Sequence, residues 1–210
     1  MSWVRLIDDD LDRLTSAAKT GTTQGFSYDA NGNRLAQTGT AASTLTYSTT
    51  SNQITAVTGA LKRTYAYNAV GNVTHDGTRS FAYNNRGRVK TTTVGTSTTT
   101  YTYNALGQRI KKAPQNRYYA YDEAGHLIGD YNSSVATKLY REMIWMGDIP
   151  VAVLTQNSDL SVNIWYIHTD HLNTPRKITR PSDNAVRWTW NPDPFGNGTS
   201  LTRTPSLPSH

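Results

Sequence analysis

The sequence contains no cysteine, and only two of its 15 acidic residues are glutamates, Glu123 and Glu142. Without cysteine the chain has no disulfide, no thiol nucleophile and no cysteine-based zinc site, and the redox compartment stays undecided. Glycoside hydrolysis by paired carboxylates would have to rest on aspartates, and no pair of them stands out. Glutamate, leucine and methionine, which favour helices, are scarce, so the sequence excludes a mostly helical protein.

A long hydrophobic run is also absent. No stretch approaches the roughly 20 apolar residues that a membrane helix needs. Acidic residues begin at Asp8, so the start does not resemble a secretory signal peptide. We therefore expect no membrane span. If the protein leaves its cell, we expect a specialised export system or a longer parent chain to carry it.

The charge balance is moderately basic. The 21 lysines and arginines exceed the 15 aspartates and glutamates by six, and the pI is near 9.5. This balance permits weak binding to nucleic acid or to anionic surfaces. It is not concentrated enough to predict a specific nucleic-acid partner.

What the chain does contain favours strands and turns. Only 36% of its residues are hydrophobic, yet it has 13 tyrosines and five tryptophans, too many aromatic residues for a disordered chain. Threonine and tyrosine favour half-buried strands, whereas asparagine, aspartate and glycine build turns. The composition therefore predicts an all-β fold.

A ten-residue pattern recurs through the first two thirds of the chain. It reads aromatic-x-Tyr, then aspartate or asparagine, then two residues and a glycine. Weaker copies cover residues 45–54 and 8–14. The tyrosine, the aspartate or asparagine, and the glycine of the five good copies are Tyr28, Asp29 and Gly32; Tyr67, Asn68 and Gly71; Tyr83, Asn84 and Gly87; Tyr103, Asn104 and Gly107; and Tyr121, Asp122 and Gly125.

Each copy predicts one β-hairpin. Alternating aromatic residues place both rings on one face of a strand. The aspartate or asparagine side chain can bond the backbone two residues on, and glycine accepts a positive φ. Unrelated hairpins of a β-sandwich are the alternative, but five copies of one pattern disfavour it. Since one hairpin cannot bury its aromatic face alone, neighbouring hairpins are expected to stack into a twisted, continuous sheet.

After residue 130 the regular spacing of tyrosines stops. Residues 140–154, 164–178 and 186–196 alternate and are richer in apolar side chains. They predict long strands, separated by turns at residues 157–159, 173–175 and 181–184.

These patterns together resemble a known family. The tandem repeats look like YD repeats, and an ordered string of residues in the last third resembles the bacterial RHS core domain. The resemblance covers roughly residues 5–198. The residues that carry the core resemblance are His168, Asp170, His171, Pro175, Arg176, Trp188, Trp190, Asp193, Pro194, Phe195 and Gly196.

The resemblance implies a sheet that spirals into a hollow shell enclosing a C-terminal toxin. Teneurin-like surface proteins, which carry related repeats, use them in adhesion. We expect YD-repeat hairpins over residues 1–130, partial core strands over 131–198 and a short disordered tail over 199–210. The expected partners are the rest of a shell or a toxin domain, with no cofactor. Open sheet edges predict self-association as well.

The chain also departs from this family. The family core runs on to an Asp-Pro-x-Gly-Leu motif at which an aspartate-assisted self-cleavage frees the toxin. Residues 193–196 match that motif only in part, since Asn197 stands where leucine is expected. They fit better as an earlier turn. We therefore expect a non-catalytic piece of a shell, too short to close, without toxin or cleavage motif.

Several residues suggest catalytic or metal-binding chemistry. His168 and Asp170 could share a strand face and hold a metal, but no third ligand lies at a suggestive spacing, so a structural role is favoured. The alternating aspartates of residues 8–12 lack the rest of a calcium loop, and an acidic turn is favoured. His75 and Asp76 could pair with a serine, yet no Gly-x-Ser-x-Gly motif is present.

Two further functions stay open as alternatives. The basic, tyrosine-rich residues 109–121 could bind nucleic acid, although the tyrosines already belong to the repeat pattern. Exposed tyrosine and tryptophan suit sugar binding, so a carbohydrate-binding or cell-surface-binding module, tested at Trp188 and Trp190, is the main alternative to a shell. An enzyme, such as a self-cleaving remnant around Asp193, is the third hypothesis.

Overall fold

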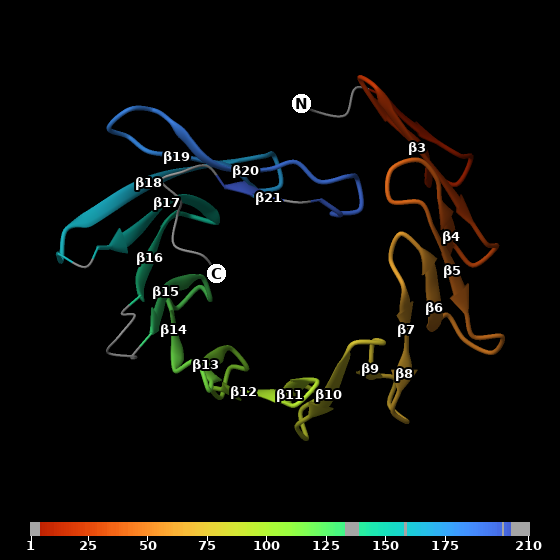
Figure 1. The fold of residues 1–210 in the computed structure, drawn as a ribbon, viewed down its shortest axis with the longest axis horizontal. Coiled ribbons are helices and arrows are strands. Elements are labelled where there is room, and N and C mark those ends of the chain that lie inside the picture. Colours follow the sequence, from red (N-terminus) through yellow and green to blue (C-terminus); the bar gives the residue numbers. More distant parts are fainter. Residues whose placement is uncertain (1–4, 133–138, 158, 199, 203–210) are drawn as a thin grey trace. The chain divides into compact units, whose positions relative to one another are not determined.

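The computed structural model describes residues 5–132, 139–157, 159–198 and 200–202. The chain forms two compact units, residues 1–98 and 99–210. In the described residues of both units, all regular structure is β-strand (Figure 1). The predicted all-β fold of antiparallel hairpins is confirmed. No helix in this described part of the chain could cross a membrane.

The first unit is a ladder of antiparallel strands in chain order. Strands β1 to β7 form one sheet in that order, and β8 to β11 pair one after another in the same way. The strands of this unit are β1 (Arg5–Asp8), β2 (Leu14–Lys19), β3 (Thr22–Tyr28), β4 (Arg34–Gln37), β5 (Ser43–Tyr47), β6 (Ile54–Gly59), β7 (Arg63–Thr64), β8 (Ala66–Tyr67), β9 (Val73–His75), β10 (Arg79–Tyr83) and β11 (Val89–Val94).

The second unit repeats this arrangement with longer strands. Each strand from β12 to β21 pairs antiparallel with the next. The strands are β12 (Ser97–Tyr103), β13 (Arg109–Ala113), β14 (Arg117–Tyr121), β15 (Leu127–Asn132), β16 (Leu139–Met146), β17 (Ile149–Gln156), β18 (Val162–Thr169), β19 (Pro175–Thr179), β20 (Val186–Trp190) and β21 (Ser200–Thr202). Pairing runs through residue 130 without a break, from β15 to β16.

Every repeat hairpin contains a β-bulge at the same place. In the β3–β4 hairpin, Ser27 pairs with Ala36 but Tyr28 pairs with Arg34, so one residue is left out of register. The same shift precedes the repeat tyrosine in each of the other hairpins. Because a bulge increases the local right-handed twist, the repeat itself gives each hairpin a twist.

Buried cross-strand pairs form the core of each ladder. In the first unit, Leu45 pairs with Val57 and both are buried. In the second unit, Val153 pairs with Trp165 and both are buried. All extensive contacts between strands join neighbours in the chain. Stability is therefore a sum of hairpin terms and nearest-neighbour terms, as in other repeat proteins.

One predicted strand proves to be a hairpin. The sequence predicts no turn within residues 140–154, but the chain reverses there between β16 and β17. Gly147, whose φ is +56°, and Asp148 form the turn between the two strands. A two-residue turn leaves the apolar alternation almost uninterrupted, which explains why the pattern hides it.

Part of the predicted C-terminal tail forms a strand. Residues 200–202 form β21 and pair with residues 188–190 of β20. The backbone of β20 offers hydrogen-bonding groups that a strand can satisfy better than a disordered tail can. The other residues of the predicted tail, 199 and 203–210, lie outside the described residues.

Candidate functional site

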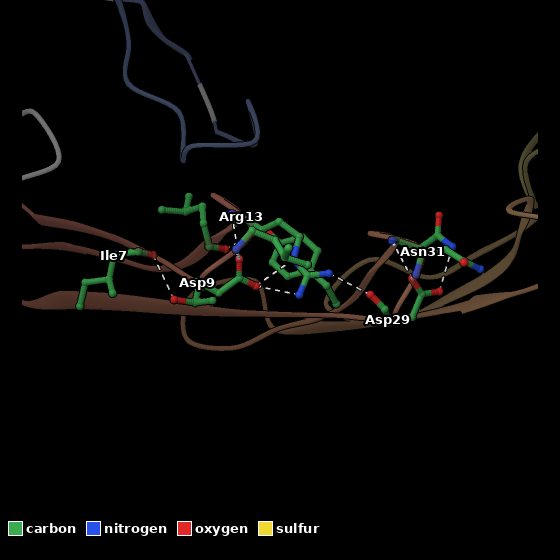
Figure 2. A network of polar contacts seen from close by, with 10 residues as sticks. Ile7, Asp9, Arg13, Asp29 and Asn31 are labelled. Atoms are coloured by element: carbon green, nitrogen blue, oxygen red, sulfur yellow. Dashed lines mark hydrogen bonds and ion pairs between the residues drawn. The ribbon is translucent and has the colours of Figure 1, made fainter.

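Most repeat hairpins share a five-residue loop that directly follows the repeat tyrosine, whereas after Tyr47 the Ser48 N–H donates to the Gln53 carbonyl across a longer loop. In the first good copy, the Asp29 N–H donates to the Asn33 carbonyl, and the Gly32 N–H donates back to the Asp29 carbonyl. The Asp29 carboxylate accepts bonds from the N–H groups of Asn31 and Asn33, at 2.9 and 2.8 Å (Figure 2). One side chain thus satisfies the N–H groups that the turn leaves unpaired.

The same loop occurs nine times in the described part of the chain, more often than the tyrosine pattern predicts. Both backbone bonds recur each time. The loops continue past residue 130, where the spacing of tyrosines ends. Their first residues are Asp9, Asp29, Asn68, Asn84, Asn104, Asp122, Asn157, Asp170 and Asp193.

The fourth residue of every loop has a positive φ. Glycine occupies this position in six loops, including Gly196 at +82°. Asp12, Leu160 and Asn173 adopt the same left-handed conformation, at +57°, +68° and +58°. The sequence predicts turns at residues 157–159 and 173–175, but it does not identify them as copies of this loop, because the repeat pattern requires a glycine. An asparagine, which tolerates this conformation, was the available signal at Asn173.

In several loops the side chain of the fifth residue connects neighbouring hairpins. The Arg13 side chain bonds Asp9 of its own loop and donates to the Asp29 carbonyl of the next loop at 2.9 Å (Figure 2). Asn33 likewise donates to Asp29 and, at 2.9 Å, to Asn52 in the following hairpin. We call this fifth residue the bridging position. The sequence pattern did not single it out.

The bridging contacts also affect the loop carboxylates. The Arg13 guanidinium lowers the pKa of Asp9, and the Asn33 side-chain amide lowers the pKa of Asp29. Both aspartates are therefore ionised at neutral pH, when they accept the bonds of their loops. Protonation in acid would weaken these loops.

The repeat tyrosines join each hairpin to the one before it. The Tyr47 hydroxyl donates to the Arg34 carbonyl at 3.0 Å, and Arg34 is the residue that pairs with Tyr28 in the preceding hairpin. Tyr28, Tyr67, Tyr83 and Tyr121 make the equivalent bond. In the next hairpin after Tyr121, the Trp145 indole N–H replaces the hydroxyl and donates to the Leu127 carbonyl at 3.0 Å.

Removing one such hydroxyl should weaken the junction between hairpins. We expect Tyr121→Phe to lower the free energy of unfolding by about 1 kcal/mol, the usual net value of one hydrogen bond. Tyr118→Phe, three residues earlier on β14, is the control, because its ring is exposed and keeps its contact with Lys111. Urea unfolding of both variants measures the difference, and equal losses would show that the bond to Arg109 contributes nothing specific.

The residues of the core resemblance form two loops and their supports. Asp170 begins one loop, and its carboxylate accepts hydrogen bonds from the backbone N–H groups of Leu172 and Thr174. The same carboxylate forms an ion pair with Arg176 at 2.7 Å. Arg176 also lies over the Trp190 ring, 5.1 Å from its centre. Asp193 begins the other loop, which contains Pro194, Phe195 and Gly196. His171 is exposed within the first loop, Pro175 begins β19, and Trp188 is half-buried on β20.

The structure does not bring the proposed metal and hydrolase residues together as those functions require. His168 bonds the Thr179 hydroxyl at 2.9 Å, whereas Asp170 bonds its own loop and Arg176. His75 lies 3.3 Å from the Ser80 hydroxyl, but Asp76 bonds the main chain and side chain of Arg79. Within the described residues, no group of three potential ligands could hold a metal ion.

The basic residues 109–117 are largely engaged by the sheet. Arg109 lies over the rings of Tyr101 and Tyr119, at 5.4 and 4.8 Å from their centres. Arg117 forms an ion pair with Asp130, which raises the pKa of Arg117. The tyrosines of this stretch therefore serve the sheet, and Arg117 is neutralised by a neighbouring strand.

Together these features define a class of protein: an all-β repeat protein whose hairpins contain bulges and five-residue loops and are joined in chain order by tyrosine hydroxyls and loop side chains. The chain belongs to the Teneurin YD-shell family, whose model matches residues 8–202. This agrees with the resemblance to YD-repeat proteins expected from the sequence. No match was found among curated proteins.

Two solved structures are similar to the chain. One is a Photorhabdus luminescens Tc holotoxin pore with a mutated TccC3, at 13% sequence identity and a TM-score of 0.46. The other is a TcdB2-TccC3 crystal structure, at 12% identity and a TM-score of 0.45. Both comparisons cover 95% of this chain and 15% of the matched chain. The chain thus spans about 15% of the length of these structures.

Proposed function

We propose that the chain is a non-catalytic structural piece of a YD shell that encloses or displays a toxin. The observation that carries this proposal is the strictly sequential ladder, in which successive hairpins are joined by recurring loop and tyrosine contacts. Such a ladder can extend by adding further hairpins. Membership of the YD-shell family supports the shell, and the resemblance of the last third of the sequence to the bacterial RHS core domain suggests a toxin as its cargo.

The edge strands of the two units indicate what the chain binds. Among the described residues, β1 is the last strand of its sheet in the first unit, and β21 is the last strand in the second. Each carries an exposed leucine, Leu6 at 57% and Leu201 at 61%. An unpaired edge with apolar side chains is a template for another strand. We propose that these edges pair with the rest of a shell, outside the producing cell, and with copies of the chain when no shell is present.

Light scattering on a size-exclusion column tests this proposal. We expect the wild-type chain to give a mass above 23.3 kDa that rises with concentration. The double variant Leu6→Lys, Leu201→Lys should give a monomer, because lysine on an edge strand opposes pairing. The control is Leu106→Lys, since Leu106 is 79% exposed but lies in a loop. A wild-type monomer at every concentration would contradict the proposal.

A further inference from the structure

The bridging position of one loop in the second unit is occupied by a histidine. His126 follows Gly125 in the loop between β14 and β15. Its Nδ1 lies 2.9 Å from the carboxylate of Asp122 in the same loop, and its Nε2 lies 2.9 Å from the carboxylate of Asp148 in the turn between β16 and β17. The imidazole thus spans two successive hairpins, as Arg13 and Asn33 do in the first unit.

The surroundings of His126 hold the ring in place. It stacks on the Trp145 indole, with ring centres 4.6 Å apart and planes 21° apart. Only 17% of the His126 side chain is exposed, whereas 88% of the Asp148 side chain is exposed. From the neighbouring hairpin, Gln108, which does not titrate, lies closest to Gly125. The charged groups in contact with the ring are Asp122 and Asp148.

This geometry depends on the charge of the ring. A neutral imidazole has one N–H and one lone pair, whereas an imidazolium has two N–H groups. Two carboxylates at 2.9 Å, one on each ring nitrogen, are both satisfied only by the imidazolium. Loss of the proton would leave a lone pair facing one carboxylate, and that contact would become repulsive.

We propose that Asp122, His126 and Asp148 form a proton-operated latch between two hairpins of the second unit. When His126 is protonated, it fastens the β16–β17 turn to the β14–β15 loop. When the proton leaves, the exposed Asp148 separates from the ring and the turn is released. Arginine and asparagine at other bridging positions make comparable contacts without titrating near neutral pH.

The direction of the pH effect follows from the two carboxylates. The hydrogen bonds to Asp122, which has the larger effect, and to Asp148 raise the pKa of His126 above its ordinary 6.5. His126 in turn lowers the pKa of Asp122. A raised pKa in the folded state means that the latch stabilises the fold fully below pH 6.5 and is lost as the pH rises through the folded pKa. The latch is therefore closed in mildly acidic solution and open in alkaline solution.

An NMR titration of the full chain between pH 5 and pH 9 tests the latch. We expect the His126 ring signals to titrate with a midpoint above 6.5. The Asp148 amide and the Trp145 indole N–H should shift with the same midpoint, because both report on the β16–β17 hairpin. Asp148→Asn should lower the His126 midpoint, and this change at an exposed side chain leaves the hairpin intact.

His126→Gln supplies the matched control, because glutamine occupies the bridging position of the preceding loop as Gln108. In this variant the Trp145 and Asp148 signals should no longer depend on pH across the neutral range. The latch is overturned if the wild-type midpoint lies at or below 6.5, or if Asp148→Asn leaves that midpoint unchanged. It is also overturned if the Trp145 signal still titrates in His126→Gln. If the glutamine variant fails to fold, the Asp148→Asn titration alone decides.

Discussion

Replacing Trp165 with alanine should destabilise the chain by about 3–5 kcal/mol, the range for removing a buried aromatic side chain. Trp165 is only 4% exposed and pairs across the sheet with the buried Val153. Its indole N–H donates to the Thr155 hydroxyl at 2.8 Å, and Thr155 is itself buried. The variant therefore leaves a cavity and also removes a hydrogen bond inside the core of the second unit.

The neighbouring residue provides the control for this substitution. Tyr166 lies on the opposite face of the same strand, β18, and its side chain is 48% exposed. Tyr166→Ala should cost at most about 1 kcal/mol, since it changes strand propensity but not the core. Urea unfolding followed by circular dichroism measures both losses. Similar losses for the two variants would mean that β18 has no buried face, contrary to the structure.

The tyrosine pattern predicted the hairpins because alternation and turn chemistry are local properties of the sequence. Two side chains on one strand face and a glycine in a left-handed position can be read from ten residues. The partner of the Tyr47 hydroxyl could not be read in this way. The Arg34 carbonyl receives that hydroxyl only after the bulges fix the register between two successive hairpins.

The loops after residue 130 show the limit of a pattern based on residue type. The loop at Asp170 has the same backbone bonds as the repeat loops, but Asn173 holds its left-handed position. The bridging position is harder still to find. Arginine, asparagine and histidine share it at residues 13, 33 and 126, because what matters is a donor that reaches two loops, and several residue types supply one.

Glycine at residue 59 should be far less replaceable than glycine at residue 32. Both have a positive φ, +101° and +84°. A Cβ on Gly59 would lie 2.4 Å from the Ala42 carbonyl oxygen, just before the adjacent strand β5, and 2.9 Å from the Cα of Ser43, the first residue of β5. A Cβ on Gly32 would meet nothing within 4 Å. The two positions therefore separate the cost of backbone strain from the cost of close packing between strands.

For Gly32→Ala we expect a loss of about 1–2 kcal/mol, which is the left-handed strain alone. For Gly59→Ala we expect that loss plus about 1–3 kcal/mol, because the β5–β6 backbones must move apart. The comparison is matched, since both glycines lie in the first unit and gain one methyl group. Equal losses in urea unfolding would mean that β5 and β6 are not held as closely at Ser43 as their pairing indicates. A larger loss at Gly59 would show that the ladder depends on close backbone contact between the paired strands β5 and β6. It would then depend on this contact as well as on the hydrogen bonds of the repeat tyrosines.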